Sequence, residues 1–268
     1  MDPHVRWKRR LEDRRARAAR VGFDYALCLA YDGPRFAGWA RQTGQHTVEG
    51  CVRELLTEET VGLRRAVVAG RTDRGVSAAG QVMSFRSEVA VDLERLRHRL
   101  DAVEGLACLD ARPAPRGFHA QFDASDRSYA YRIEATPSRL RLLPRLDALM
   151  RGLEGERDFR AYARQIPPDL STVRRMVSAR CRLRTVDARP VLSFELRASG
   201  FLRKMVRVVV ATAIEAAEGG AAEDTLARLA ERPEDRGTAF PAPPEPLCFL
   251  GPRYPSWPLI ESPFREAW

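Results

Sequence analysis

Two hydrophobic periodicities alternate along the chain, and they restrict its fold more than any other feature of the sequence. Apolar residues recur at every second position over Phe23–Tyr31, which is typical of a strand with one buried face. Behind the N-cap residue Thr47 they recur three and four positions apart over 48–56, which is typical of an amphipathic helix. The same reasoning predicts further strands at 66–69, 81–87, 128–135, 181–186 and 191–198, and further helices at 93–103, 147–153, 203–218 and 223–230.

Each half of the chain repeats, in outline, the order strand, helix, strands, helix. That order indicates an α+β fold made of two halves with antiparallel sheets, and the break between them is expected near 123–126. We therefore expect a basic N-terminal tail over 1–21, a first α+β half over 22–125 and a second α+β half over 126–268. A cleft between the halves is the expected place for a ligand.

The charge balance predicts a polyanionic partner for this chain. The net charge is +9 and the pI is near 9.9, and Lys8 and Lys204 are the only lysines among 45 basic residues. Arginine matches phosphate geometry and stacks on bases better than lysine does, so nucleic acid is the first choice. A GC-rich genome would explain the preference for arginine equally well, but not the net excess of positive charge. Residues 1–20 carry eight basic and three acidic side chains, as a solvated tail or as an RNA-binding arm.

Several classes of protein are disfavoured by composition. No apolar run reaches the roughly 18 residues that would span a bilayer, and no apolar segment of a secretory signal begins the chain, so a cytoplasmic protein is expected. The five cysteines are widely spaced and form no C-x-x-C pair, and the four histidines form no cluster. Neither a metal site, a disulfide framework nor a bound cofactor is predicted.

The densest group of polar residues lies in a loop bracketed by Gly70 and Gly75. These glycines allow a sharp bend and a close approach of a ligand. Between them stands Asp73, with Arg71 and Arg74 on either side, so its carboxylate is expected to be ionised at neutral pH. Taken alone, this pattern is more typical of a surface turn with a local ion pair, and it does not name a reaction.

The context of the loop identifies the chain by resemblance. In order and rough spacing, its motifs over about 23–250 closely resemble those of the tRNA pseudouridine synthase A (TruA) family. The motif of highest specificity is A-G-R-T-D-x-G-V at 69–76, followed by G-Q-V at 80–82. The others are Y-D-G at 31–33, G-W-A-R-Q at 38–42, T-V-E at 47–49, F-H-A at 118–120, F-D-A at 122–124, R-S-Y-A-Y at 127–131 and F-L-R-K-M-V-R at 201–207.

The resemblance implies a role for four residues. Asp73 matches the aspartate that is essential to pseudouridine synthases, and Arg71 matches the arginine that fills the space left by the flipped base. Tyr129 matches the tyrosine that stacks on the target uracil, and Arg207 matches the arginine that pairs with the catalytic carboxylate. Further candidate RNA contacts are Arg74, Arg41, Gln42, Arg203, Lys204 and His119.

The resemblance also implies a fold, a substrate and an assembly. The implied pseudouridine synthase fold joins two α+β halves through one extended antiparallel sheet, with helices on one side and a central basic cleft. The implied activity is that of an isomerase that converts uridine to pseudouridine in the anticodon stem-loop of tRNA, at positions 38 to 40. The family acts as a homodimer and uses no cofactor or metal.

This chain departs from the family pattern at three positions of its motifs. Arg74 and Ser77 stand where many relatives have alanine and histidine, and Ala40 stands where they have glutamine. The departures leave two rival functions open: a pseudouridine synthase that acts on another RNA, and a catalytically weak RNA-binding paralogue. For the main hypothesis the residue types fit the chemistry, because a carboxylate can act on C1′ of the ribose as a nucleophile or as a base.

Overall fold

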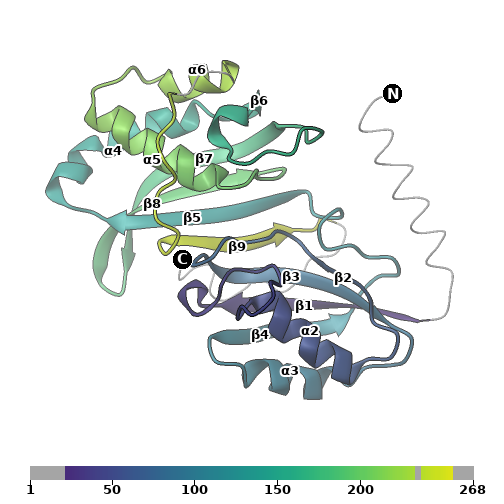
Figure 1. The fold of residues 1–268 in the computed structure, drawn as a ribbon. Helices are drawn as coiled ribbons and strands as arrows, with labels where there is room; N and C mark the ends of the chain where they lie inside the picture. The colour runs from purple at the N-terminus through teal and green to yellow at the C-terminus, as the bar shows by residue number, and fades with distance from the viewer. Residues whose placement is uncertain (1–21, 233–236, 256–268) are drawn as a thin grey trace.

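The structure is a computed structural model that describes residues 22–232 and 237–255. A 9-stranded sheet runs through it in the order β4-β1-β3-β9-β5-β8-β7-β6, and β2 pairs with β3 beside this path (Figure 1). The strands are β1 (Phe23–Tyr31), β2 (Arg64–Val68), β3 (Ser77–Ser87), β4 (Leu106–Pro113), β5 (Asp126–Glu134), β6 (Gly155–Asp158), β7 (Val173–Val186), β8 (Arg189–Ala198) and β9 (Leu247–Arg253). The helices of the described residues are α2 (Val48–Glu59), α3 (Leu93–Asp101), α4 (Pro137–Arg151), α5 (Met205–Glu218) and α6 (Thr225–Glu231), with 3-10 turns at Gly33–Arg35 and Arg160–Tyr162.

The expected fold class is confirmed, since the chain is α+β with a large and mostly antiparallel sheet. β1 pairs antiparallel with both β3 and β4, and α2 and α3 lie beside these strands in Figure 1. β5, β8, β7 and β6 form a second antiparallel series, beside which α4, α5 and α6 lie. The division at 125/126 and the central basic cleft remain predictions.

β9 joins the two series of strands into one sheet. It runs antiparallel to β5, with Tyr129 opposite Phe249, and pairs parallel with β3 only at Ser77 and Ala78. β2 pairs with the other end of β3, between positions 83 and 86. The connection from β2 to β3 therefore lies close to the place where β9 begins to pair with β3, at the junction of the two series.

Each face of the first series carries its own apolar cluster. Leu27, Leu29 and Met83 belong to the main core, which continues through both series and α5. The alternate positions Ala26 and Val82 belong to a smaller cluster, because successive side chains of a strand point to opposite faces. Residues 114–124 contribute to this smaller cluster and cover that second face.

Several elements differ from the sequence-based expectation for identifiable reasons. β3 begins at Ser77 rather than at 81, because every residue of the strand is buried and no polar alternation marks its start. α4 begins at Pro137, where proline is compatible with the first helical turn, and Thr136 caps it through a bond from the backbone N–H of Arg139. α5 begins at Met205 rather than at 203, because Lys204 has a left-handed backbone with φ 61°. β4 and β6 were not expected.

Three other expectations concern the tail, membranes and metals. The basic tail predicted over 1–21 lies outside the described residues. Within the described ranges, no helix is long and apolar enough to cross a bilayer. The same ranges contain no group of three or more histidine, cysteine, aspartate or glutamate residues that could hold a metal ion.

Candidate active site

The loop that carries Asp73 is the connection between β2 and β3. Where the loop begins, the N–H of Ala69 donates to the carbonyl of Val82 (2.8 Å). Where it ends, the N–H of Val76 donates to the carbonyl of Asp73 (3.2 Å) and closes a turn. Gly75 has φ +81°, a conformation that favours glycine, whereas Gly70 has no positive φ. Of the two bracketing glycines, only Gly75 therefore has a left-handed backbone.

Two segments from the first half pack against the loop and fix its position. A Cβ added to Gly33 would lie 2.3 Å from the carbonyl carbon of Val76, so only glycine allows this approach. The N–H of Gly33 donates to Oγ of Ser77 (3.0 Å), and the N–H of Trp39 donates to the carbonyl of Thr72 (3.1 Å). Ser77, one of the departures from the family pattern, thus bonds the turn after β1 to the end of the loop.

A buried hydrogen-bond network lies beneath the loop. The Tyr31 hydroxyl is 2.8 Å from Oγ1 of Thr72, and Nε2 of Gln81 lies 3.3 Å from the same hydroxyl. Nε2 of Gln81 also donates to the carbonyl of Gly70 at 2.6 Å. All three side chains are buried, and burial raises the pKa of Tyr31 well above its ordinary value, so the hydroxyl is neutral. The network connects β1 and β3 to the residues on either side of Arg71.

The Asp73 carboxylate is paired with a guanidinium from the second half. Nη1 of Arg207 lies 3.4 Å from Oδ2 of Asp73, and the side chain of Asp73 is 31% exposed whereas that of Arg207 is only 12% exposed. Arg207 stands in the first turn of α5, in a run that is otherwise apolar. The carboxylate is therefore accessible to a ligand while its cationic partner is held in the protein.

Arg207 is itself positioned by the segment between α6 and β9. Its Nε donates to the carbonyl of Ala242 (2.6 Å), and the N–H of Ala242 donates back to the carbonyl of Arg207 (3.1 Å). We name residues 237–246 the connecting segment; it runs past α5 towards β9 in Figure 1. It also approaches the loop, because a Cβ on Gly75 would lie 3.0 Å from Cγ of Pro244.

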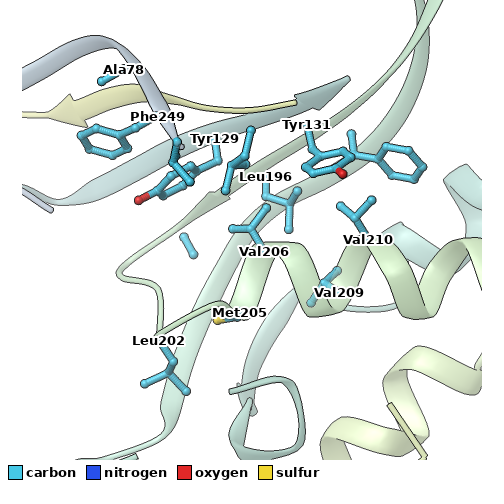
Figure 2. Packing of buried hydrophobic residues seen from close by; sticks show 14 of the residues in the cluster. Ala78, Tyr129, Tyr131, Leu196, Leu202, Met205, Val206, Val209, Val210 and Phe249 are labelled. Carbon is cyan, nitrogen blue, oxygen red and sulfur yellow. The ribbon is translucent and has the colours of Figure 1, made fainter. Parts of the chain in front are cut away.

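Tyr129 lies in the apolar layer next to this ion pair. Its ring contacts Phe201 edge-on at 5.0 Å and Phe249 at 4.9 Å between centroids, and it is 8% exposed. Figure 2 shows the ring between Phe249 and Leu196, over Val206 of α5. Burial, with smaller contributions from Tyr31 and Asp73, raises the pKa of Tyr129 well above its ordinary value. The hydroxyl is therefore neutral, and it lies close enough to Asp73 to be affected by its charge.

Four of the polar candidates lie exposed on or beside the loop. Arg71 and Arg74 belong to the loop itself, and Arg74 donates from Nη2 to Oε1 of Gln45 (2.8 Å). Arg41 and Gln42 follow Trp39, whose backbone contacts the loop. Among them, Arg71 lies close enough to Glu49 for its positive charge to contribute to the lowered pKa of that carboxyl. The structure thus brings these four candidates into the neighbourhood of Asp73.

The last three candidates are placed differently from one another. Arg203 is exposed and Lys204 half-buried, and they stand just before α5, four and three residues before Arg207. His119 lies in the segment over the second face of the sheet, where its Nδ1 accepts from the N–H of Phe122 at 3.2 Å. His119 thus bonds within the segment that covers the second face, and its contact with RNA remains a prediction.

Sequence reasoning missed the groups that hold the loop and the arginine. Tyr31 and Gln81 were recognised only as strand residues and as members of motifs, since alternation reports burial and not a buried hydrogen bond. The glutamine in a fully buried strand is the signal that could have revealed the network, because buried polar side chains need partners. The carbonyl of Ala242 carries no side-chain signal.

Comparison of the sequence with known proteins identifies its family. A family model described as tRNA pseudouridine synthase matches residues 149–255, which include α5 and the connecting segment. A tRNA pseudouridine synthase A from Roseiflexus sp. (strain RS-1) is 35% identical over 245 residues, which cover 86% of this chain and 90% of that protein. The chain belongs to the tRNA pseudouridine synthase A family.

Other members of the family are similarly related along most of their length. The tRNA pseudouridine synthase A of Chloroflexus aurantiacus (strain ATCC 29366 / DSM 635 / J-10-fl) is 36% identical over 250 residues, 86% of this chain and 88% of that protein. That of Geobacter sp. (strain M21) is 31% identical over 245 residues, 85% of this chain and 98% of that protein. Alignments of this length extend beyond 149–255 into the first half of the chain, where the Asp73 loop lies.

Proposed function

We propose that this chain isomerises uridine to pseudouridine in tRNA, with the carboxylate of Asp73 as the catalytic group. The observation that carries the proposal is the pair of Asp73 and Arg207, in which the carboxylate is partly exposed and its cationic partner is nearly buried. Membership of the family supports the reaction and the substrate class. The excess of basic residues supports a polyanionic substrate.

The reaction needs a carboxylate and no change of oxidation state. The N1–C1′ bond of uridine breaks, the free uracil turns, and C5 joins C1′; the proton on C5 leaves and N1 gains one. The carboxylate acts on C1′ as a nucleophile or as the base of an elimination, and both routes require it to be ionised and aimed. Arg207, whose Nη1 lies 3.4 Å from Oδ2 of Asp73, holds and aims the carboxylate through a charge-assisted hydrogen bond.

The other roles follow from where the residues lie. The target base must leave the stack, at a cost of about a few kcal/mol. We assign to the exposed Arg71 the space that the flipped base leaves, and to Tyr129 the ring against which the uracil rests. Arg74, Arg41, Gln42, Arg203 and Lys204 are the candidate phosphate and base contacts, and phosphate contacts offset part of the flipping cost.

Release of tritium from tRNA that carries ³H at C5 of uracil tests the proposal. Wild-type protein is expected to release tritium, and Asp73→Asn is expected to bind the tRNA without releasing it. Asp224→Asn is the matched control, because Asp224 pairs with Arg228 at 3.2 Å on the exposed surface of the second half. Equal release by wild type and Asp73→Asn would remove Asp73 from the mechanism.

The same assay distinguishes the rival functions. Binding of tRNA without any release by the wild type would identify an RNA-binding paralogue that has lost catalysis. Mapping of modified uridines in RNA from cells with and without the gene tests the substrate. We expect the anticodon stem-loop of tRNA to lose pseudouridine, and loss confined to another RNA would reassign the substrate.

The assembly and location of the protein are also part of the proposal. On the resemblance to the family, we propose a homodimer that acts in the cytoplasm. Sedimentation velocity of the full chain is expected to give a species of about twice the chain mass, and a monomer at assay concentrations would contradict the dimer. Fractionation of cells that express a tagged copy tests the location.

A further inference from the structure

One aromatic side chain of the connecting segment lies almost entirely in solvent. Phe240 is 91% exposed, the largest exposed fraction among the large hydrophobic residues that the structure describes. Exposure of a phenylalanine ring to water is unfavourable. Single exposed hydrophobic residues are common on protein surfaces, so it is the position of this ring beside the candidate site that points to a ligand.

The backbone around Phe240 is held on both sides. The N–H of Ala239 donates to Oγ1 of Thr212 (3.1 Å), and its carbonyl accepts from Nη2 of Arg164 (2.8 Å). Two residues after Phe240, both backbone groups of Ala242 bond to Arg207. Pro241 follows directly and restricts the backbone of Phe240 to extended conformations. The ring is thus presented by an ordered segment.

The place of Phe240 relative to the site supports an RNA ligand. Ala242, which holds the guanidinium that pairs with Asp73, is only two residues away, and consecutive Cα atoms are about 3.8 Å apart. The anchor Arg164 also donates its N–H to the carbonyl of Arg203, an exposed cation in front of α5. An exposed aromatic ring beside arginines is the composition of sites on which unpaired bases stack.

We propose that Phe240 is a stacking platform for an unpaired base of the RNA substrate, next to the nucleotide that is isomerised. The proposal rests on the proposed function, because it takes the RNA from there. Phe240 thereby adds binding free energy and orients the strand on the side of the site formed by the connecting segment. It touches no reacting atom of the target nucleotide, so it is a substrate-binding residue.

Three substitutions at this position separate stacking from other roles. Phe240→Ala and Phe240→Leu remove the aromatic face, and Phe240→Trp keeps one. Phe23→Ala is the matched control, since Phe23 is also an exposed aromatic residue (48%) but stands at the opposite end of β1 from Tyr31. Binding of a tritiated anticodon stem-loop RNA and tritium release are measured for each, with sedimentation velocity and thermal unfolding of every variant.

Stacking predicts a specific set of results. Phe240→Ala and Phe240→Leu are expected to raise the Kd and KM for RNA by about fivefold to a hundredfold, the range for loss of one base stack. The increase in KM is expected to exceed any decrease in kcat. Phe240→Trp is expected to restore binding, and its added tryptophan fluorescence is expected to be quenched by RNA. Phe23→Ala is expected to bind RNA as the wild type does.

Other results would overturn the proposal. Unchanged RNA affinity in Phe240→Ala would exclude a contact, and full rescue by leucine would indicate an apolar contact without stacking. A change in sedimentation would assign the ring to a contact between copies of the chain. Failure of the proposed function is separate, since it would appear as absence of tritium release by the wild type.

Discussion

Nη1 of Arg207 and Oδ2 of Asp73 lie 3.4 Å apart although 134 positions separate the two residues in the sequence. The loop of Asp73 precedes β3, whereas Arg207 stands on a helix beside the second series of strands. β9 pairs with both β3 and β5, and so it fixes the position of the Asp73 loop relative to the helix that carries Arg207. The candidate catalytic centre therefore exists only when both halves of the sheet are joined.

The geometry of this pair predicts the effect of a change that keeps the charge. Arg207→Lys retains a cation but loses the fork that bonds the Ala242 carbonyl through Nε while it reaches Asp73 through Nη1. We expect kcat to fall by about a hundredfold, the scale of a misplacement by about 1 Å, with little change in RNA affinity. Single-turnover tritium release and RNA binding by the same preparation measure the two effects.

An arginine in a comparable but exposed pair controls for this substitution. Arg228 pairs with Asp224 at 3.2 Å on α6, and both side chains are more than half exposed. Exposed pairs contribute about 0–1 kcal/mol, so Arg228→Lys is expected to change neither stability nor release measurably. Wild-type kcat in Arg207→Lys would show that charge alone is needed at this position.

Gln81 is predicted to act on catalysis through the backbone of the loop. Gln81→Leu removes the donor to the Gly70 carbonyl and to the Tyr31 hydroxyl, so the carbonyl loses this bond and the hydroxyl keeps only its bond with Thr72. We expect a loss of about 1–3 kcal/mol in the free energy of unfolding. Because the loop then shifts, we also expect at least about a tenfold lower kcat at temperatures where the variant is fully folded.

A serine on the same strand separates positioning from stability. The Ser84 hydroxyl accepts from the N–H of Ala120 at 3.0 Å, on the other face of the sheet. Ser84→Ala is expected to cost a similar free energy of unfolding without lowering kcat. Equal kcat in Gln81→Leu and Ser84→Ala, at equal folded fraction, would leave Gln81 with a structural role only.

The two halves of the site differed in how far the sequence predicted them. Asp73 and Arg71 stand four residues or less from a strand in a short motif, so local pattern and resemblance were enough to select them. The support of Arg207 by a backbone carbonyl of a proline-rich segment depends on a tertiary contact that no residue type announces. The strand around Tyr129 was expected, but its place between Phe201 and Phe249 depends on how β9 and the chain before α5 approach β5.

The same distinction holds for the fold. Alternation predicted β1, because its two faces differ in their neighbours, and periodicity predicted α2. β3 was predicted too short, because a strand buried on both faces shows no alternation, and Ser77 to Gly80 are small or polar. The pairing of β9 with β3 could not be inferred, because strand order is decided by contacts distant in sequence.

Tyr129 is predicted to need its ring more than its hydroxyl. Tyr129→Phe keeps the contacts with Phe201 and Phe249 and removes only a neutral hydroxyl, so we expect stability and RNA binding close to the wild type. Tyr129→Leu loses the aromatic face, and we expect kcat to fall by about tenfold or more because the freed uracil is less well held. Tritium release and thermal unfolding of both variants test this, and activity of Tyr129→Leu equal to that of Tyr129→Phe would contradict it.

The buried hydroxyl of Tyr31 predicts a loss of stability at alkaline pH. In the unfolded chain a tyrosine ionises near pH 10, whereas burial raises the pKa of Tyr31 in the folded protein well above that value. Above about pH 10 the unfolded state therefore releases a proton that the folded state retains. The stability due to the neutral hydroxyl is complete below pH 10 and is lost as pH rises through the folded pKa, by up to about 1.4 kcal/mol per pH unit.

Two substitutions in the same hydrogen bond test this dependence. Tyr31→Phe removes the ionisable group, so its free energy of unfolding is expected to fall less steeply than that of the wild type between about pH 9 and pH 11. Thr72→Val breaks the same 2.8 Å bond but keeps the hydroxyl, so its slope is expected to match the wild type. Burial also raises the pKa of Tyr129, Tyr162 and Tyr254, so some slope remains in every variant. Urea unfolding followed by circular dichroism measures the slopes, and identical slopes for Tyr31→Phe and the wild type would show that this hydroxyl does not couple to folding.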